Sequence, residues 1–186
     1  MSRARTPQNI YTCNLAKLLL FSLNEGRDEL LGTTVIDAIP ALTPGYLRYE
    51  EVAARLQTVL EKSFAQAADM IECVGFATVV DSLSAIKYAK VTPHRSIEGI
   101  TTAFTHKHSY IHYSTHASEI LELEIWLRSN IERAVRATAE TTLKRIVFVS
   151  GSYNEVYGRK TGATPNRRAA GETLAVANDV SATKET

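Results

Sequence analysis

The sequence has few cysteines, no long apolar run and almost no net charge, and each of these features excludes a class of protein. Its two cysteines, Cys13 and Cys73, show no C-x-x-C spacing, so the sequence predicts two buried free thiols and no oxidising compartment. Apolar runs such as Leu18–Phe21 are far too short to cross a bilayer. The segment Met1–Gln8 lacks the apolar core of a signal peptide. We therefore expect a soluble, intracellular chain without a membrane segment.

The chain also lacks the motifs of common catalytic sites. Ser150-Gly151-Ser152 is not part of a G-x-S-x-G elbow, and no glycine-rich phosphate loop or H-E-x-x-H motif is present. Three carboxylates near residue 120 have no identifiable partner nucleophile. The sequence therefore predicts that the protein is not an enzyme and takes no cofactor and no small-molecule substrate.

What the chain does have is the composition of one folded domain. It contains 186 residues, of which 45% are hydrophobic, and its formal net charge is +1. The hydrophobic content excludes disorder of the whole chain. The net charge gives no electrostatic signature of a nucleic-acid-binding protein, so the local distribution of charge has to decide that question.

Apolar residues at helical spacing predict an all-α fold, a four-helix bundle with up-down topology. The predicted helices are Asn9–Asn24, Arg48–Phe64, Ala65 to about Lys87, and Ser118–Val149. The segment Arg27–Ile39 fits a helix or a strand. Val91–Thr115 shows neither period and is interpreted as a long loop.

The end of the chain is polar and has few large apolar groups. We expect a helical domain over residues 1–157 and a flexible C-terminal tail over residues 158–186, because such a tail cannot offset its own ordering entropy. The tail should therefore be dispensable for assembly.

All five histidines lie in or next to the predicted long loop. On a helix, His108, His112 and His116 would share one face and could hold zinc. Residues such as Thr105 and Ile111 favour extended structure, which would break that face. The pattern favours a polar loop over a metal site.

The last predicted helix carries two charged groups. Arg128, Arg133 and Arg136 could form a stripe that contacts phosphates, although composition alone favours a solvated face with a Glu132–Arg136 ion pair. The acidic group at the start of the helix is explained by the helix dipole without any function. It consists of Glu119, Glu122 and Glu124.

Several short segments, in this order, resemble tobamovirus-type coat proteins. The segment Arg128–Arg136, running on to Gly151-Ser152-Tyr153-Asn154, resembles the last long helix of that family and the element that follows it. His94–Glu98 resembles a short piece after the preceding helix. Gly26–Asp28 and Leu47–Tyr49 fall where related coat proteins have comparable pieces.

The resemblance implies a capsid protein that assembles into a helical rod of identical subunits around single-stranded RNA, within a virion built in the host cytoplasm. It assigns RNA contacts to Arg95, Arg128 and Arg136, with Lys90 as a weaker addition. One alternative is a small helical nucleic-acid-binding protein that forms no capsid. A second is a metal-dependent protein built on the histidines.

The same resemblance places the start of the last helix close to RNA and to neighbouring subunits. Glu119 and Glu122 share a helix face, so they are candidates for a carboxylate switch that strengthens assembly as the pH falls. The equal alternative is that these side chains simply complement the helix dipole in solvent.

Overall fold

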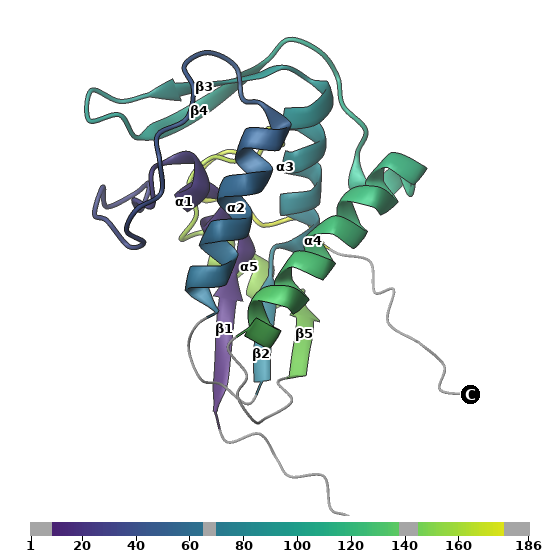
Figure 1. Cartoon of the computed structure of the whole chain (residues 1–186). Coiled ribbons are helices and arrows are strands. Elements are labelled where there is room, and N and C mark those ends of the chain that lie inside the picture. Colours follow the sequence, from purple (N-terminus) through teal and green to yellow (C-terminus); the bar gives the residue numbers. More distant parts are fainter. Residues whose placement is uncertain (1–8, 65–69, 138–144, 177–186) are drawn as a thin grey trace, which may run out of the picture.

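The structure is a computed structural model that describes residues 9–64, 70–137 and 145–176, and these residues form a mixed α/β fold (Figure 1). The prediction of an all-α four-helix bundle is therefore wrong. In chain order the elements are β1 (Ile10–Asn14), α1 (Leu15–Leu23), α2 (Tyr49–Ser63), β2 (Met70–Val74), α3 (Phe76–Tyr88), β3 (Val91–Arg95), β4 (Thr101–His106), a 3-10 turn (Tyr113–Thr115), α4 (Ser118–Ala137), β5 (Arg145–Val149) and α5 (Ser152–Gly158).

The centre of the fold is a parallel sheet with the strand order β1-β2-β5. Parallel neighbours need long crossover connections, which α1 and α2 supply between β1 and β2. The connection from β2 to β5 contains α3, the antiparallel hairpin β3–β4 and α4. Figure 1 shows the three strands side by side, with the hairpin at the opposite end of the molecule.

One face of this sheet forms part of the hydrophobic core. Cys13, Cys73 and Phe148 are in register on that face and pack with apolar residues of α1 to α4. Every residue of α1 except Lys17 is buried, as expected for a helix that is apolar on nearly all sides. The opposite face, which we call the outer face, carries Thr12 and Glu72, both only half-buried.

Two of the three parallel strands, β1 and β2, were missed because each runs directly into a helix. Asn14 ends β1 and caps α1, and Gly75 alone separates β2 from α3. In a window that spans both elements, the longer helix dominates the apolar period and hides a short strand. The third strand, β5, lies within the predicted helix Ser118–Val149, in which α4 ends at Ala137.

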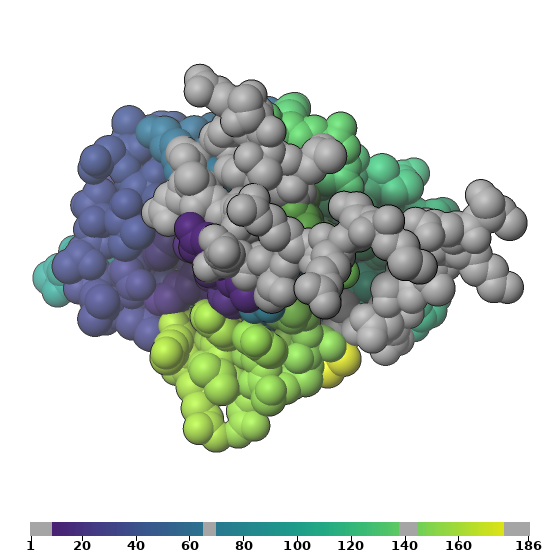
Figure 2. Space-filling view, turned by 90° about the horizontal axis from the view of Figure 1, so that it is seen from below, coloured from purple at the N-terminus to yellow at the C-terminus, as the bar shows by residue number. Residues whose placement is uncertain are grey.

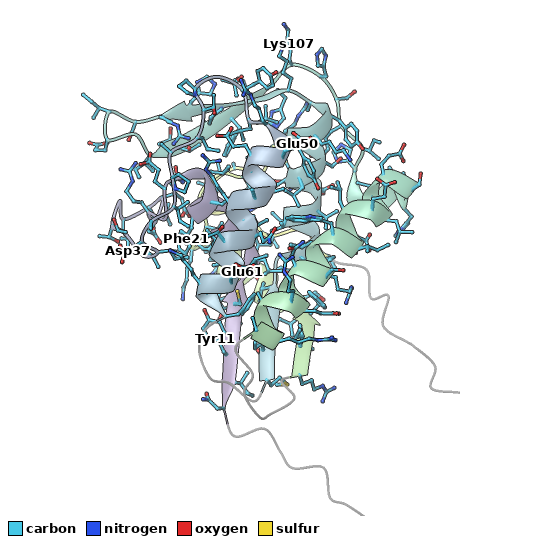
Figure 3. All side chains as sticks on the ribbon, viewed as in Figure 1. Tyr11, Phe21, Asp37, Glu50, Glu61 and Lys107 are labelled. Carbon is cyan, nitrogen blue, oxygen red and sulfur yellow. The ribbon has the colours of Figure 1, made fainter. Side chains whose placement is uncertain are left out.

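The remaining elements agree better with the sequence. The predicted helix Arg48–Phe64 is α2, and Val52, Leu56 and Val59 are buried as its apolar stripe requires. Helix α2 also contacts α4: Arg133 lies 3.5 Å from Glu61, one of the two residues labelled on α2 in Figure 3. The predicted loop Val91–Thr115 contains the hairpin β3–β4. Of the helices in the described ranges, none has the length and hydrophobicity needed to traverse a bilayer.

Candidate ligand site on the outer face of the parallel sheet

The carboxyl ends of the three parallel strands meet at one edge of the sheet. There, β1 ends at Asn14, β2 at Val74 and β5 at Val149, and Gly75 and Gly151 precede the helices that follow β2 and β5. Both glycines have positive φ, 80° at Gly75 and 74° at Gly151, a conformation that other residues adopt only with strain. This edge is where open α/β sheets bind their ligands, because loops and helix starts converge on it.

Residues 158–176, which we call the 158–176 segment, pack against this edge. Leu174 is 1% exposed and contacts Ala16 and Val74. A Cβ atom on Gly75 would lie 3.1 Å from the Leu174 Cδ1 atom, so glycine also makes room for the segment. Seen from the amino ends of the strands, the yellow-green residues of α5 and the segment form a mass beside β1 (Figure 2).

Hydrogen bonds also tie the segment to the strand ends. Asn14 Nδ2 donates to Thr161 Oγ1 at 2.9 Å, and the amide of Ala175 donates to Thr78 Oγ1 at 2.7 Å. The sequence analysis placed a domain boundary at residue 158. The structure packs residues 158–176 against the sheet, whereas residues 177–186 lie outside the described residues.

A buried ionic cluster lies beside the same edge. Lys17 Nζ is 2.8 Å from Asp28 Oδ2 and 2.9 Å from Glu29 Oε1, and the amide of Gly162 donates to Glu29 Oε1 at 2.7 Å. Burial disfavours the charged form of Asp28, but hydrogen bonds from Lys17 and from the amides of Leu30 and Leu31 outweigh it and lower the pKa of Asp28. This cluster connects α1 to the 158–176 segment.

Arg168 holds the segment in shape from inside. The side chain is buried and donates to the carbonyl oxygens of Gly162, Thr161 and Gly158 at 2.9, 3.0 and 3.3 Å. Burial lowers the pKa of Arg168, although the nearby Glu172 and Glu29 carboxylates raise it. The Arg168 Nε atom and the Glu29 Oε2 atom are buried without a hydrogen-bond partner. Because its guanidinium donates to several carbonyl oxygens of the 158–176 segment, Arg168 has a structural role within that segment.

The far end of the segment docks on the hairpin. The His106 ring donates from Nε2 to the Pro165 carbonyl, and Tyr110 Oη donates to the Asn166 carbonyl at 2.8 Å. Burial raises the pKa of Tyr110 to about 12, so its hydroxyl keeps its proton at neutral pH. The histidine-rich stretch thus anchors this segment. The described residues contain no group of three or more His, Cys, Asp or Glu side chains placed to hold a metal ion.

The outer face of the sheet presents polar groups next to this edge. Thr12 Oγ1 donates to Glu72 Oε2 at 3.1 Å, and Asn14 follows on the same face of β1 because side chains alternate along a strand. Arg145 begins β5 on this face, in register with Met70, and is exposed. One anion, one cation and two neutral hydrogen-bonding groups therefore share the outer face.

The arginines and the lysine predicted from sequence lie elsewhere. Arg95 donates to the carbonyl oxygens of Gly99 and Leu23 at 2.9 and 3.0 Å, and burial lowers its pKa. The guanidinium of Arg128 lies 4.5 Å from the Phe148 ring centroid. Two further side chains complete the set: the Arg136 side chain is 82% exposed, and Lys90 Nζ lies 4.9 Å from the Tyr46 ring centroid. The structure does not bring these four side chains together.

Glu119, one of the two residues predicted to form a carboxylate switch across a subunit contact, lies in the first turn of α4. Its pKa is lowered by its own backbone amide and by Ser118, whose hydroxyl donates to it at 3.0 Å. Among the three acidic residues, burial raises the pKa of Glu124. The pairing of Glu119 and Glu122 across a subunit contact stays a prediction.

The residues of the edge and of the outer face were missed, although the sequence held some signals. Lys17 interrupts an otherwise apolar helix, and Asp28 and Glu29 follow the end of that helix, which is the pattern of a buried ion pair. The outer face gave no signal, because Thr12 and Glu72 become neighbours only once their strands are recognised.

Comparisons with known proteins agree with an α/β enzyme. The model of the family "Pyruvate formate lyase-like" matches residues 4–70. Formate acetyltransferase 1 of Escherichia coli (strain K12) is 27% identical over 190 residues, which cover 85% of this chain and 25% of that enzyme. The chain thus spans about a quarter of the length of this relative.

The structural comparison supports the fold. The crystal structure of hydroxyproline dehydratase from Clostridioides difficile, with its substrate trans-4-hydroxy-L-proline bound, matches with a TM-score of 0.59 and 15% identity. The match covers 90% of this chain and 29% of that one. Together the sequence comparisons show that this chain is similar to pyruvate formate lyase-like proteins.

These findings overturn the interpretation as a viral coat protein. The predicted capsid function, the RNA partner with its helical polymer of subunits, and the location in a virion are wrong, because the relatives are cellular enzymes that act on small molecules. The prediction that the protein is not an enzyme is contradicted by the same relatives. The alternative of a small nucleic-acid-binding protein is also unsupported. The roles assigned to Arg95, Arg128, Arg136 and Lys90 have therefore lost the partner on which they depended.

Proposed function

We propose that this chain forms part of an enzyme that acts on a small amino acid or hydroxy acid, which binds on the outer face of the parallel sheet. The observation that carries the proposal is the set of side chains Thr12, Glu72 and Arg145, which share this face. Arg145 lies at the amino end of β5, whereas Thr12 and Glu72 lie closer to the carboxyl edge. In α/β proteins, ligands bind at this edge.

The charges on the outer face favour one class of ligand. A lone carboxylate would be repelled by Glu72, but an ammonium or hydroxyl group can donate to it. Arg145 can pair with the carboxylate of the same ligand through two parallel hydrogen bonds. Arg145 is in register with Met70, two residues before Glu72, which separates the two charges by ~7 Å along the strands. The Arg145 and Glu72 side chains are long enough to contact the two charged groups of one small zwitterion.

The names of the relatives fit this ligand class. The structural relative binds trans-4-hydroxy-L-proline, which carries a carboxylate, a ring ammonium and a hydroxyl group. The other relative is a formate acetyltransferase, whose name refers to formate, the simplest carboxylate. The charges on the outer face favour a ligand of the first kind over a bare carboxylate.

The 158–176 segment would act as one wall of the site. Its hydrogen bond with Asn14 and the cluster around Lys17 and Glu29 fix it beside the strand ends. We assign positioning roles to these residues, because their polar groups are occupied by the protein itself.

The sheet supports a role within a larger catalytic unit. In the described residues, the outer edges of β1 and β5 have no strand partner. Purely parallel sheets are usually larger and covered on both faces, so we propose that further strands complete this one. The short share of the relatives that the chain spans agrees with this arrangement.

Calorimetric titration of the full chain with trans-4-hydroxy-L-proline and with formate tests the ligand class. We expect Glu72→Gln to weaken hydroxyproline binding about tenfold, because a charge-assisted hydrogen bond becomes a neutral one, and to leave formate binding unchanged or stronger. Glu61→Gln is the matched control, because Glu61 lies on α2 and faces Arg133. The proposal fails if neither compound binds, or if both variants weaken binding equally.

A further inference from the structure

The two cysteines lie opposite each other on neighbouring strands of the sheet. Cys13 on β1 is in register with Cys73 on β2, and both side chains point to the core face. Neighbouring strands lie about 4.8 Å apart. This spacing falls within the roughly 4.4–6.8 Å between Cα atoms that a disulfide needs. The spacing of the two strands is therefore compatible with a bond between the two thiols.

The surroundings of the two thiols leave them only each other to react with. Cys13 is 2% exposed and Cys73 is 0% exposed, and both belong to the main hydrophobic core. Both are free cysteines. Burial raises the pKa of Cys73 to about 12, and burial, together with the neighbouring Cys73 thiol, also raises the pKa of Cys13. Among the described residues, no cation contributes to the pKa of either thiol, so neither is activated in that way.

The fold also provides a route for a reagent to reach the pair. In this chain on its own, without the further strands proposed above, the described residues pair β1 only with β2, and its first residue, Ile10, is 50% exposed. Edge strands open more readily than central ones, because only one side is held by backbone hydrogen bonds. Oxidation of the buried pair should therefore be slow and limited by the opening of β1.

We propose that Cys13 and Cys73 are the site of an intrachain disulfide, formed by exchange with a low-molecular-weight disulfide such as oxidised glutathione. The thiolate of one cysteine attacks oxidised glutathione, and one glutathione thiolate leaves and takes up the released proton. The thiolate of the second cysteine then attacks the mixed disulfide and releases a second glutathione. Two protein thiols are oxidised to one disulfide, and one glutathione disulfide is reduced to two thiols.

The bond would lock β1 to the central strand β2. Asn14, the residue after Cys13, would then be held at the sheet edge from which it donates to Thr161. Since a disulfide that closes a long loop restricts the unfolded chain, the oxidised protein should unfold at a higher temperature. We expect a rise in Tm of at least about 5 °C for a domain of this size.

The decisive experiment compares the redox equilibrium of the folded chain with that of the chain in urea. The full chain is equilibrated in glutathione buffers of graded composition, the thiols are trapped at low pH, and intact mass gives the fraction with a protein disulfide. We expect the folded chain to form the bond at an effective thiol concentration at least about tenfold higher than the unfolded chain. An equal or lower value in the folded chain would overturn the proposal.

Single cysteine variants provide the control for where the bond forms. Cys13→Ser and Cys73→Ser should each yield only the mixed disulfide with glutathione, whereas the wild type loses two hydrogens and remains a monomer on a non-reducing gel. Disulfide-linked dimers as the main wild-type product would contradict the proposal. Because the redox equilibrium is measured on the wild type, the proposal stays testable even if a variant folds poorly.

Discussion

Among single residues, Lys17 and the two carboxylates that it contacts should have a clear effect on the free energy of unfolding. The Glu29 side chain is 2% exposed and depends on Lys17 for its charge partner. Lys17→Met should lower the free energy of unfolding by about 3 kcal/mol, because it leaves two carboxylates partly or fully buried without a cation. Urea denaturation measures this. Lys62→Met is the control, because Lys62 donates to the exposed carbonyl of Asp37, and it should cost less than about 1 kcal/mol.

Asp28 makes a second prediction at this scale, which concerns acid. Its pKa is lower in the folded chain than in the unfolded chain, so its contribution to stability is complete at neutral pH and is lost as the pH falls below about 4. Asp28→Asn should therefore be less stable than the wild type at pH 7, and the difference should shrink toward pH 3. Urea midpoints across this range test it, with Asp37→Asn as an exposed control. A difference that stays constant with pH would remove Asp28 from the acid response.

The sequence predicted single residues well where burial alone decides. Cys13 and Cys73 are buried and free, as predicted, and Leu56 and Leu60 lie on the buried side of α2. It failed where a role depends on a partner distant in the chain. Arg128 was assigned to RNA but lies over Phe148, a residue of β5 that no local pattern could place there.

At the scale of elements, the junction between β2 and α3 is constrained by a single glycine. Gly75 has a φ of 80°, and an added Cβ atom would lie 3.1 Å from Leu174. Gly75→Ala should destabilise the chain by about 2 kcal/mol, through backbone strain together with displacement of Leu174. Gly45→Ala is the matched control, because Gly45 also has a positive φ but has nothing within 4 Å of the added atom. Equal losses in chemical denaturation would show that the contact with Leu174 has no effect.

Elements could be predicted from sequence when their period extends over several turns. Helix α2 was placed within one residue at each end, and the start of α4 was found at Ser118. The five-residue strands could not be predicted from the sequence. A single capping residue or a single glycine between a strand and a helix is too weak a signal to mark where one element ends and the next begins. Because the strands were not predicted, the sheet and its outer face were not predicted either. The arginines were therefore taken as the functional residues.

For the whole molecule, the 158–176 segment joins the sheet edge to the hairpin. Truncation after Tyr157 removes Leu174 from Ala16 and Val74 and leaves Glu29 without the Gly162 amide. We expect a lower Tm and greater exposure of apolar surface, measured by differential scanning calorimetry and dye binding. Truncation after Val176 keeps every described contact and should leave Tm nearly unchanged. If both truncations behave alike, the contacts of the segment are not needed for stability.

The most direct test of the account maps where a small amino acid binds. In a two-dimensional amide NMR titration with trans-4-hydroxy-L-proline, the account predicts shifts concentrated at residues 12–14, 72–75 and 145–147. The hairpin amides around Lys107, at the far end of the molecule in Figure 3, should not move. Shifts confined to the hairpin or to α4, or no shifts at saturating hydroxyproline, would contradict the claim that the outer face of the sheet is the ligand site.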